Sequence, residues 1–164
     1  METQPAFIVK IIVDAWLGQV KRVDALLEEL NDEQLQQEIA PGKNSGAYLV
    51  GHLAAIHDAM LPILELGQKL HPELEEIFVK NPDKSGLQKP SVGQVRKYWK
   101  EINDTLESHF LKLSTEEWLQ KHTIVSAEDF AKQPYRNKLN VLINRTNHMA
   151  NHIGQMLLLK KRSN

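Results

Sequence analysis

The feature that most constrains the fold is the spacing of apolar residues, which recur in steps of three and four along four long segments. Such spacing places the apolar side chains on one side of a helix with 3.6 residues per turn. No segment shows the strict alternation that is typical of a strand, and no internal repeat is visible. We therefore predict an all-α fold.

The first two predicted helices cover residues 5–30 and residues 45–70. The apolar stripe of the first helix consists of six residues: Ile8, Ile12, Ala15, Val23, Leu26 and Leu30. In the second helix, Pro62 lies opposite the stripe, so its kink is expected to face solvent. Asp58 is expected to project to the solvent side as well.

Capping signals mark the start of the third helix and of a short segment after it. Ser91 and Gln94 have the spacing of a capping box, and Ser114 and Glu117 repeat it. The stripe of the third helix extends to Leu113. The last helix is predicted over residues 136–161, with four inward residues: Leu142, Met149, Ile153 and Met156.

Four such helices predict a four-helix bundle that forms a single domain over residues 1–164. Each helix would span about 30–39 Å at 1.5 Å per residue. Residues 71–90 are polar and contain three prolines, which indicates a long crossover between the second and third helices. A crossover of this length allows these two helices to run parallel.

Charge and cysteine content exclude several classes of function. The chain has 20 basic and 21 acidic residues, so its net charge of −1 gives no support to binding of nucleic acid or of an anionic membrane. The absence of cysteine excludes disulfides, thiolate metal sites and a cysteine nucleophile. No signal peptide or membrane span is predicted, and we expect a soluble, cytoplasmic protein.

The seven histidines are the main indication of function. His148 and His152 stand four residues apart on the inward side of the last helix, and His52 lies on the inward stripe of the second. His57 and His109 are undecided candidates. The two remaining histidines are expected in loops: His71 and His122.

Two interpretations of the inward histidines stay open on spacing alone. Each ring can be a core histidine that is satisfied by a hydrogen bond to a neighbour. Alternatively, one shared metal ion satisfies all three rings, which spares the free energy of burying several unpaired polar groups. Three inward histidines on two helices slightly favour the metal.

Gly51-His52-Leu53, followed by Asn147-His148 and His152-Ile153-Gly154-Gln155, resembles the DinB/YfiT-like superfamily over nearly the whole chain. The resemblance implies an up-down-down-up bundle, often a homodimer, with a divalent metal bound by His52, His148 and His152. Superfamily members include metal-dependent thiol transferases and maleylpyruvate-isomerase-like proteins. The family name derives from damage-inducible genes, but the charge of this chain does not support a role on DNA.

Three neutral imidazoles leave the ion its full charge and leave coordination positions open, as in catalytic zinc sites. Imidazole donors favour zinc or nickel, with iron or manganese as alternatives. An activated water predicts a hydrolase, whereas a thiol predicts an S-transferase. Because the chain has no cysteine, that thiol must be a low-molecular-weight co-substrate.

The remaining site residues leave two functions open. Arg145 either binds an anionic small-molecule substrate or pairs with a carboxylate of another helix. Gln155 is expected to support a ligand or lie on the surface rather than to act in catalysis, and no general base is obvious. The chain is thus predicted to be a metal-dependent hydrolase or thiol transferase. The open coordination positions favour this enzyme. The alternative is a non-catalytic, metal-stabilised dimeric interaction module, which the missing general base favours and which a fourth protein ligand would also favour.

Overall fold

The computed structural model describes residues 4–162, and within this range it contains helices and two isolated β-bridges but no strand. The four longest helices are α1 (Gln4–Glu29), α3 (Gly46–Asp58), α6 (Val92–Phe110) and α9 (Lys138–Met156). The shorter elements are α2 (Asp32–Gln36), α4 (Met60–Ile63), α5 (Glu73–Phe78), α7 (Thr115–Trp118), α8 (Ala127–Lys132) and the 3₁₀ helix η1 (Leu157–Arg162). The predicted all-α fold is confirmed.

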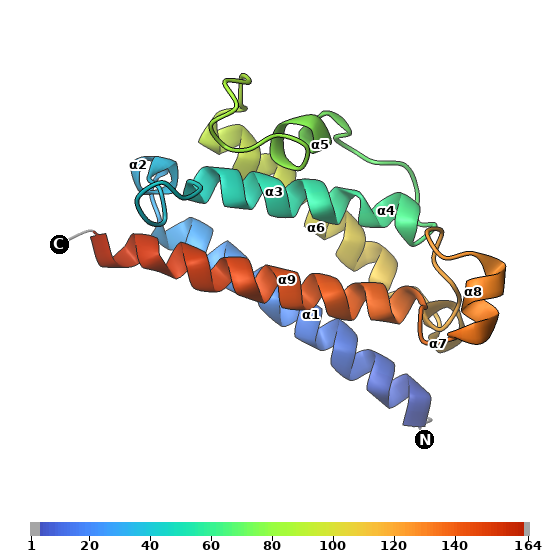
Figure 1. Ribbon diagram of the computed structural model, residues 1–164. Coiled ribbons are helices and arrows are strands. Elements are labelled where there is room, and N and C mark those ends of the chain that lie inside the picture. The colour runs from blue at the N-terminus through green and yellow to red at the C-terminus, as the bar shows by residue number, and fades with distance from the viewer. Residues whose placement is uncertain (1–3, 163–164) are drawn as a thin grey trace.

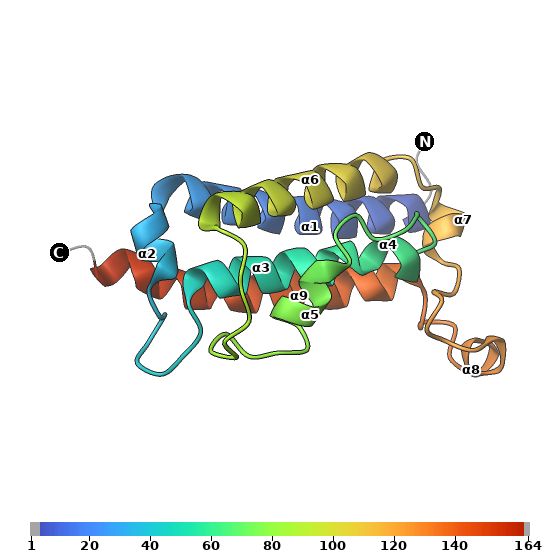
Figure 2. The same cartoon turned by 90° about the horizontal axis from the view of Figure 1, so that it is seen from above.

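The long helices lie in two layers, with α1 and α6 in one and α3 and α9 in the other (Figure 2). In Figure 1, α1 and α9 run from right to left, while α3 and α6 run from left to right. The core fills the space between the layers, and its largest fully buried side chains include Trp16, Trp99 and Trp118. None of the helices in residues 4–162 is long and apolar enough to cross a membrane.

Helix starts follow the predicted capping signals. Ser91 and Gln94 form a capping box at the start of α6, and Ser114 and Glu117 form another at α7. The last helix begins at Lys138, two residues later than predicted, because the Asn137 side chain caps it. Its α-helical part ends at Met156, and the chain continues as the 3₁₀ helix η1.

The prediction of one helix over residues 45–70 is wrong. The helix α3 ends at Asp58, and only the short α4 follows before the chain turns away. Pro62 has no N–H to donate to the carbonyl of Asp58, so the helical hydrogen bonds are interrupted there. The Asp58 side chain is buried rather than solvent-facing, because its carboxylate accepts the backbone N–H groups of Leu70 and His71 at 2.8 and 2.9 Å.

The predicted stripe of the first helix is wrong in its first half. Ile8 and Ala15 are exposed, and the core side consists of Val9, Val13 and Trp16. Residues 7–13 are apolar at almost every position, so periodicity does not identify the buried side. The fold buries the large Trp16 ring instead, and this choice turns Ile8 outward.

The crossover contains a helix that periodicity did not predict, namely α5. It packs on α3. A Cβ atom at Gly51 would overlap the Phe78 ring, so the missing side chain at this position is what allows α5 to approach α3. This approach brings the end of α5 against His52.

Candidate metal centre

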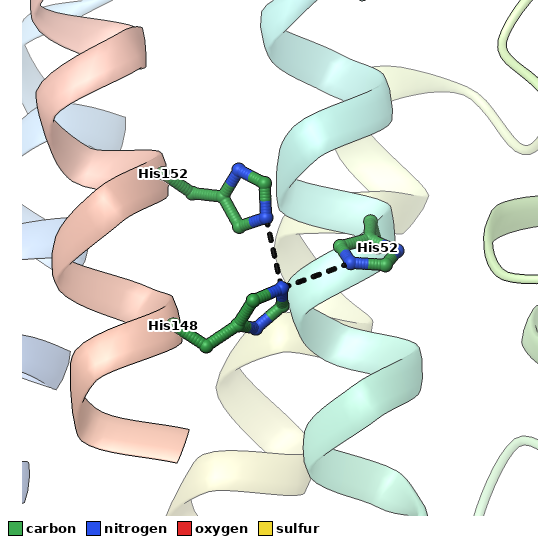
Figure 3. A group of neighbouring side chains, drawn as sticks. All are labelled: His52, His148 and His152. Atoms are coloured by element: carbon green, nitrogen blue, oxygen red, sulfur yellow. Dashed lines mark hydrogen bonds between the residues drawn. The ribbon is translucent and has the colours of Figure 1, made fainter. Parts of the chain in front are cut away.

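Three histidine rings meet between α3 and α9. His52 projects from α3, and His148 and His152 project from successive turns of α9 (Figure 3). The Nε2 atom of His148 lies 3.3 Å from Nε2 of His52 and 3.0 Å from Nε2 of His152. All three rings are half-buried, and one ligand atom from each lies within 4.8 Å of the others.

Two of the rings are oriented by acceptors on their outer nitrogen. His52 Nδ1 donates to the carbonyl oxygen of Phe78 at 2.8 Å, and His152 Nδ1 donates to Oε1 of Gln155 at 2.7 Å. Because Nδ1 carries the proton in each ring, Nε2 presents a lone pair. The expectation that Gln155 supports a ligand agrees with this contact. Without an ion, the proton of His148 lies on its Nε2. This N–H donates to the Nε2 lone pairs of both His52 and His152.

The surroundings of His148 and His152 favour the neutral form of these two rings. Burial is the first cause that lowers the pKa of His148 to about 4, and positive charge on His152, His52 or Arg145 would add to it. Burial also lowers the pKa of His152, against a raising effect of the hydrogen bond to Gln155. Neutral imidazole is the form that binds metal, so at neutral pH no proton competes strongly at these nitrogens.

Two of the three nitrogen separations fit one first-row metal ion. With metal–nitrogen bonds of about 2.1 Å, the 3.0 and 3.3 Å separations subtend angles of about 91° and about 104° at the ion. These angles lie between the octahedral and tetrahedral values. Within residues 4–162, the group consists of three histidines with no carboxylate and no fourth histidine. A three-histidine set leaves coordination positions for a water or substrate.

The other predicted candidates are not members of this three-histidine group. His57 is completely buried and bonded to Asn103, and the partly buried His109 is also outside the three-histidine group. Arg145 is partly buried. In the part of the chain that the structure describes, it makes no ion pair, and its Nε atom is buried without a partner. The carboxylate partner that was the alternative explanation for Arg145 is therefore not found there.

Several residues that shape the site carried no recognisable sequence signal. Tyr48 stacks on His52 with an interplanar angle of 10°, and its hydroxyl donates to the carbonyl of Asn81. The Phe78 carbonyl that orients His52 belongs to the backbone, so no residue type marks it. Only Gly51 was visible beforehand, as part of the Gly-His-Leu motif, and its close approach to Phe78 explains why glycine is required there.

Comparison with protein families matches residues 16–156 to the DinB superfamily, whereas a comparison with curated proteins found no match. The matched range begins in α1 and extends to the last residue of α9, so it contains all three histidines. It covers most of the 164-residue chain, and it agrees with the resemblance that the histidine motifs indicated. The chain belongs to the DinB superfamily.

Proposed function

We propose that this protein is a metal-dependent enzyme in which His52, His148 and His152 hold one divalent ion. The observation that carries the proposal is the convergence of three Nε2 atoms, two of them on rings whose Nδ1 is fixed by an acceptor. A divalent ion held by three neutral ligands keeps its charge and lowers the pKa of a coordinated water or thiol. Imidazole donors without a carboxylate support zinc or nickel ahead of iron or manganese.

Metal content tests the first part of the proposal. Protein purified without a metal-affinity column is expected to contain about one first-row transition ion per chain by elemental analysis. His148→Ala removes the central nitrogen of the three and is expected to abolish this content. His122→Ala is the control, because this loop histidine lies outside the group and should leave the content unchanged. Full occupancy in His148→Ala would contradict the assignment.

The chain supports S-transfer better than hydrolysis. Within the described residues no carboxylate lies with the three histidines to act as a general base. A thiol, with a pKa of about 8.5, needs less help than water to lose its proton. In the proposed reaction the thiol releases its proton to solvent and its sulfur bonds to an electrophilic carbon of the acceptor. The leaving group departs with the electron pair of the broken bond.

Arg145 supports an acceptor that carries an anionic group. It lies three residues before His148 on the same side of α9, and its guanidinium has no carboxylate partner in residues 4–162. Burial lowers its pKa, yet a guanidinium stays charged at neutral pH. A partly buried, unpaired cation one turn from the ligands is a suitable contact for a carboxylate or phosphate of the substrate.

A substrate screen tests both statements. The metal-loaded protein is incubated with low-molecular-weight thiols and electrophilic acceptors, with acceptor in water alone as the control for hydrolysis. We expect thiol-dependent turnover, and Arg145→Gln should raise KM for anionic acceptors about 10-fold or more, as expected when a charged hydrogen bond is lost. It should leave neutral acceptors unaffected. Turnover without thiol would assign a hydrolase, and no turnover would favour a non-catalytic, metal-stabilised module.

We further infer that residues 1–164 form one domain of the up-down-down-up bundle type, supported by the helix directions in Figure 1. We also propose that two copies associate through the outer side of α1 and α9. Three apolar side chains of α1 are more than half exposed there: Phe7, Ile8 and Ile11. The exposed residues of α9 are uncharged: Ile143, Asn144, Asn147, Asn151 and Gly154. Depletion of charge is typical of the buried centre of an interface, and a second copy supplies the matching surface.

A further inference from the structure

Four buried side-chain atoms in residues 4–162 have no hydrogen-bond partner: Trp16 Nε1, His57 Nε2, Arg145 Nε and His148 Nδ1. The indole and guanidinium nitrogens are donors only. The roles of the two histidine nitrogens depend on which nitrogen of each ring carries the proton. Unpaired buried polar atoms cost free energy, so a cluster of them calls for a shared partner.

The hydrogen bonds of Asn103 determine the protonation of His57. Asn103 Nδ2 donates to the carbonyl of Trp99 at 2.7 Å, so its Oδ1 is the atom that faces His57. His57 Nδ1 lies 2.7 Å from that oxygen and must donate to it. In the neutral ring, Nε2 is therefore an acceptor. It is held rigidly, because the ring lies between the indoles of Trp16 and Trp99, with centroid distances of 5.7 and 5.2 Å.

The unpaired nitrogen of His148 points away from the other two ligands. Figure 3 shows its Nδ1 on the side of the ring opposite to His152. His57 follows His52 by five residues on α3, and positive charge on His148, Arg145 or His52 would lower its pKa. The ring of His57 contacts Trp16 of α1, and α1 and α3 both pack on α9, so His57 Nε2 and His148 Nδ1 are buried in the core that these three helices enclose. No direct hydrogen bond joins His57 to His148.

We propose that one internal water molecule joins Trp16 Nε1, His57 Nε2 and His148 Nδ1, and that His57 is thereby a positioning residue for the ligand His148. Water suits this place because it both donates and accepts. The water accepts from Trp16 Nε1 and donates to His57 Nε2, both with and without the metal ion. It donates to His148 Nδ1 when Nε2 is protonated, and it accepts from Nδ1 when Nε2 binds the ion. A fixed carbonyl or amide N–H would serve only one of these two forms.

This inference rests on the proposed metal site and extends it. A ligand histidine whose outer nitrogen is held keeps its lone pair directed at the ion, and loss of such a contact typically weakens metal binding about 10–100-fold. Asn103, His57 and the water thus form a chain from α6 through α3 to α9. This chain of contacts raises the affinity for the ion without adding to the three ligands.

Zinc affinity of three variants tests the proposal. Each protein is stripped of metal and titrated with Zn²⁺ in competition with a chromophoric chelator. His57→Phe keeps the ring between the two indoles but removes the acceptor, and we expect affinity to fall about 10–100-fold. His57→Gln restores an acceptor and should recover most of it. His71→Phe is the matched control, since that ring also packs on an aromatic residue, Tyr98, but bonds to Glu101. The His71→Phe variant should have the same zinc affinity as the unchanged chain.

The outcomes separate this inference from the metal site itself. No zinc binding by the unchanged chain would overturn the metal centre, whereas equal affinity of that chain and a folded His57→Phe would overturn only the positioning role. Circular dichroism and thermal unfolding of the metal-free variants establish that they fold. Should His57→Phe not fold, a crystal structure of the unchanged chain decides. An ordered water within hydrogen-bond distance of Trp16 Nε1 and His57 Nε2 supports the proposal, and its absence overturns it.

Discussion

The complete burial of His57 makes the stability of the folded protein depend on pH. Burial is the largest of the effects that lower its pKa from 6.5 to about 4, and the hydrogen bond that His57 donates to Asn103 only partly offsets it. Between these two pH values, the unfolded chain binds a proton at His57 that the folded chain does not. The free energy of unfolding therefore falls as pH decreases from about 6.5 to about 4, by up to about 3 kcal/mol from this residue.

His57→Phe is expected to make the metal-free protein less sensitive to acid. Urea unfolding of both proteins at pH 7 and at pH 4.5 measures the two losses of stability. The loss should be smaller in the variant, because it lacks the buried imidazole that takes up a proton on unfolding. An equal loss would mean that His57 is protonated in the folded protein or does not titrate in this range.

At the scale of residues, spacing within one helix predicted more than pairing between helices. His148 and His152 were placed together because four residues make about one helical turn. Helical spacing does not predict the partners of His57 and His52, because Asn103 and Phe78 lie 46 and 26 residues away in sequence. Nothing in a single sequence specifies those contacts. The inward stripes grouped His52 with the pair on the last helix and slightly favoured a shared metal, and the family resemblance implied all three as ligands.

Among the elements, the contact between α3 and α5 has the clearest consequence for the site. Gly51 allows the Phe78 ring to lie against α3, and the carbonyl of the same residue orients His52. A methyl group at position 51 would push α5 outward. The hydrogen bond to His52 Nδ1 would then lengthen or break, although none of the three ligands would be altered.

Gly51→Ala is therefore expected to lower both stability and zinc affinity, the latter about 10-fold or more. Gly154→Ala is the control. Gly154 also neighbours a ligand histidine in a helix, but a Cβ there meets no atom within 4 Å. This control should keep its zinc affinity and gain up to about 1 kcal/mol in helix stability. Thermal unfolding and chelator competition measure the two quantities, and unchanged affinity in Gly51→Ala would contradict the role given to α5.

The elements also show where periodicity stops being informative. In α1 nearly every residue from 7 to 13 is apolar, so the burial of Val9 and Val13 was decided by packing against the other helices. The early end of α3 was visible in principle at Pro62, but apolar residues continue beyond it. In α6 the capping box predicted the start of the helix, whereas the predicted stripe to Leu113 is too long, because the helix ends at Phe110.

For the whole molecule, the exposed apolar side of α1 predicts self-association. Ile11→Glu places a charge within the proposed interface and is expected to convert a dimer to a monomer in sedimentation velocity at micromolar concentration. Ile124→Glu is the matched control, because Ile124 is 67% exposed and follows Thr123, which bonds to Ile63 of α4 rather than to α1. It should leave the dimer intact. A monomeric unchanged chain would remove the dimer from the proposal and leave the metal centre unaffected.

The division of the three histidines between α3 and α9 has a consequence for biosynthesis. His52 and His148 are 96 residues apart, so a ribosome that has completed α3 must translate the whole crossover, α6, α7 and α8 before the second ligand exists. A nascent chain that lacks α9 offers only His52 of the three nitrogens and cannot retain an ion there. In the proposed metal centre, loading would thus be a late event that requires α9 to lie beside α3. A shortage of the ion in the cell would then affect completed chains rather than nascent ones.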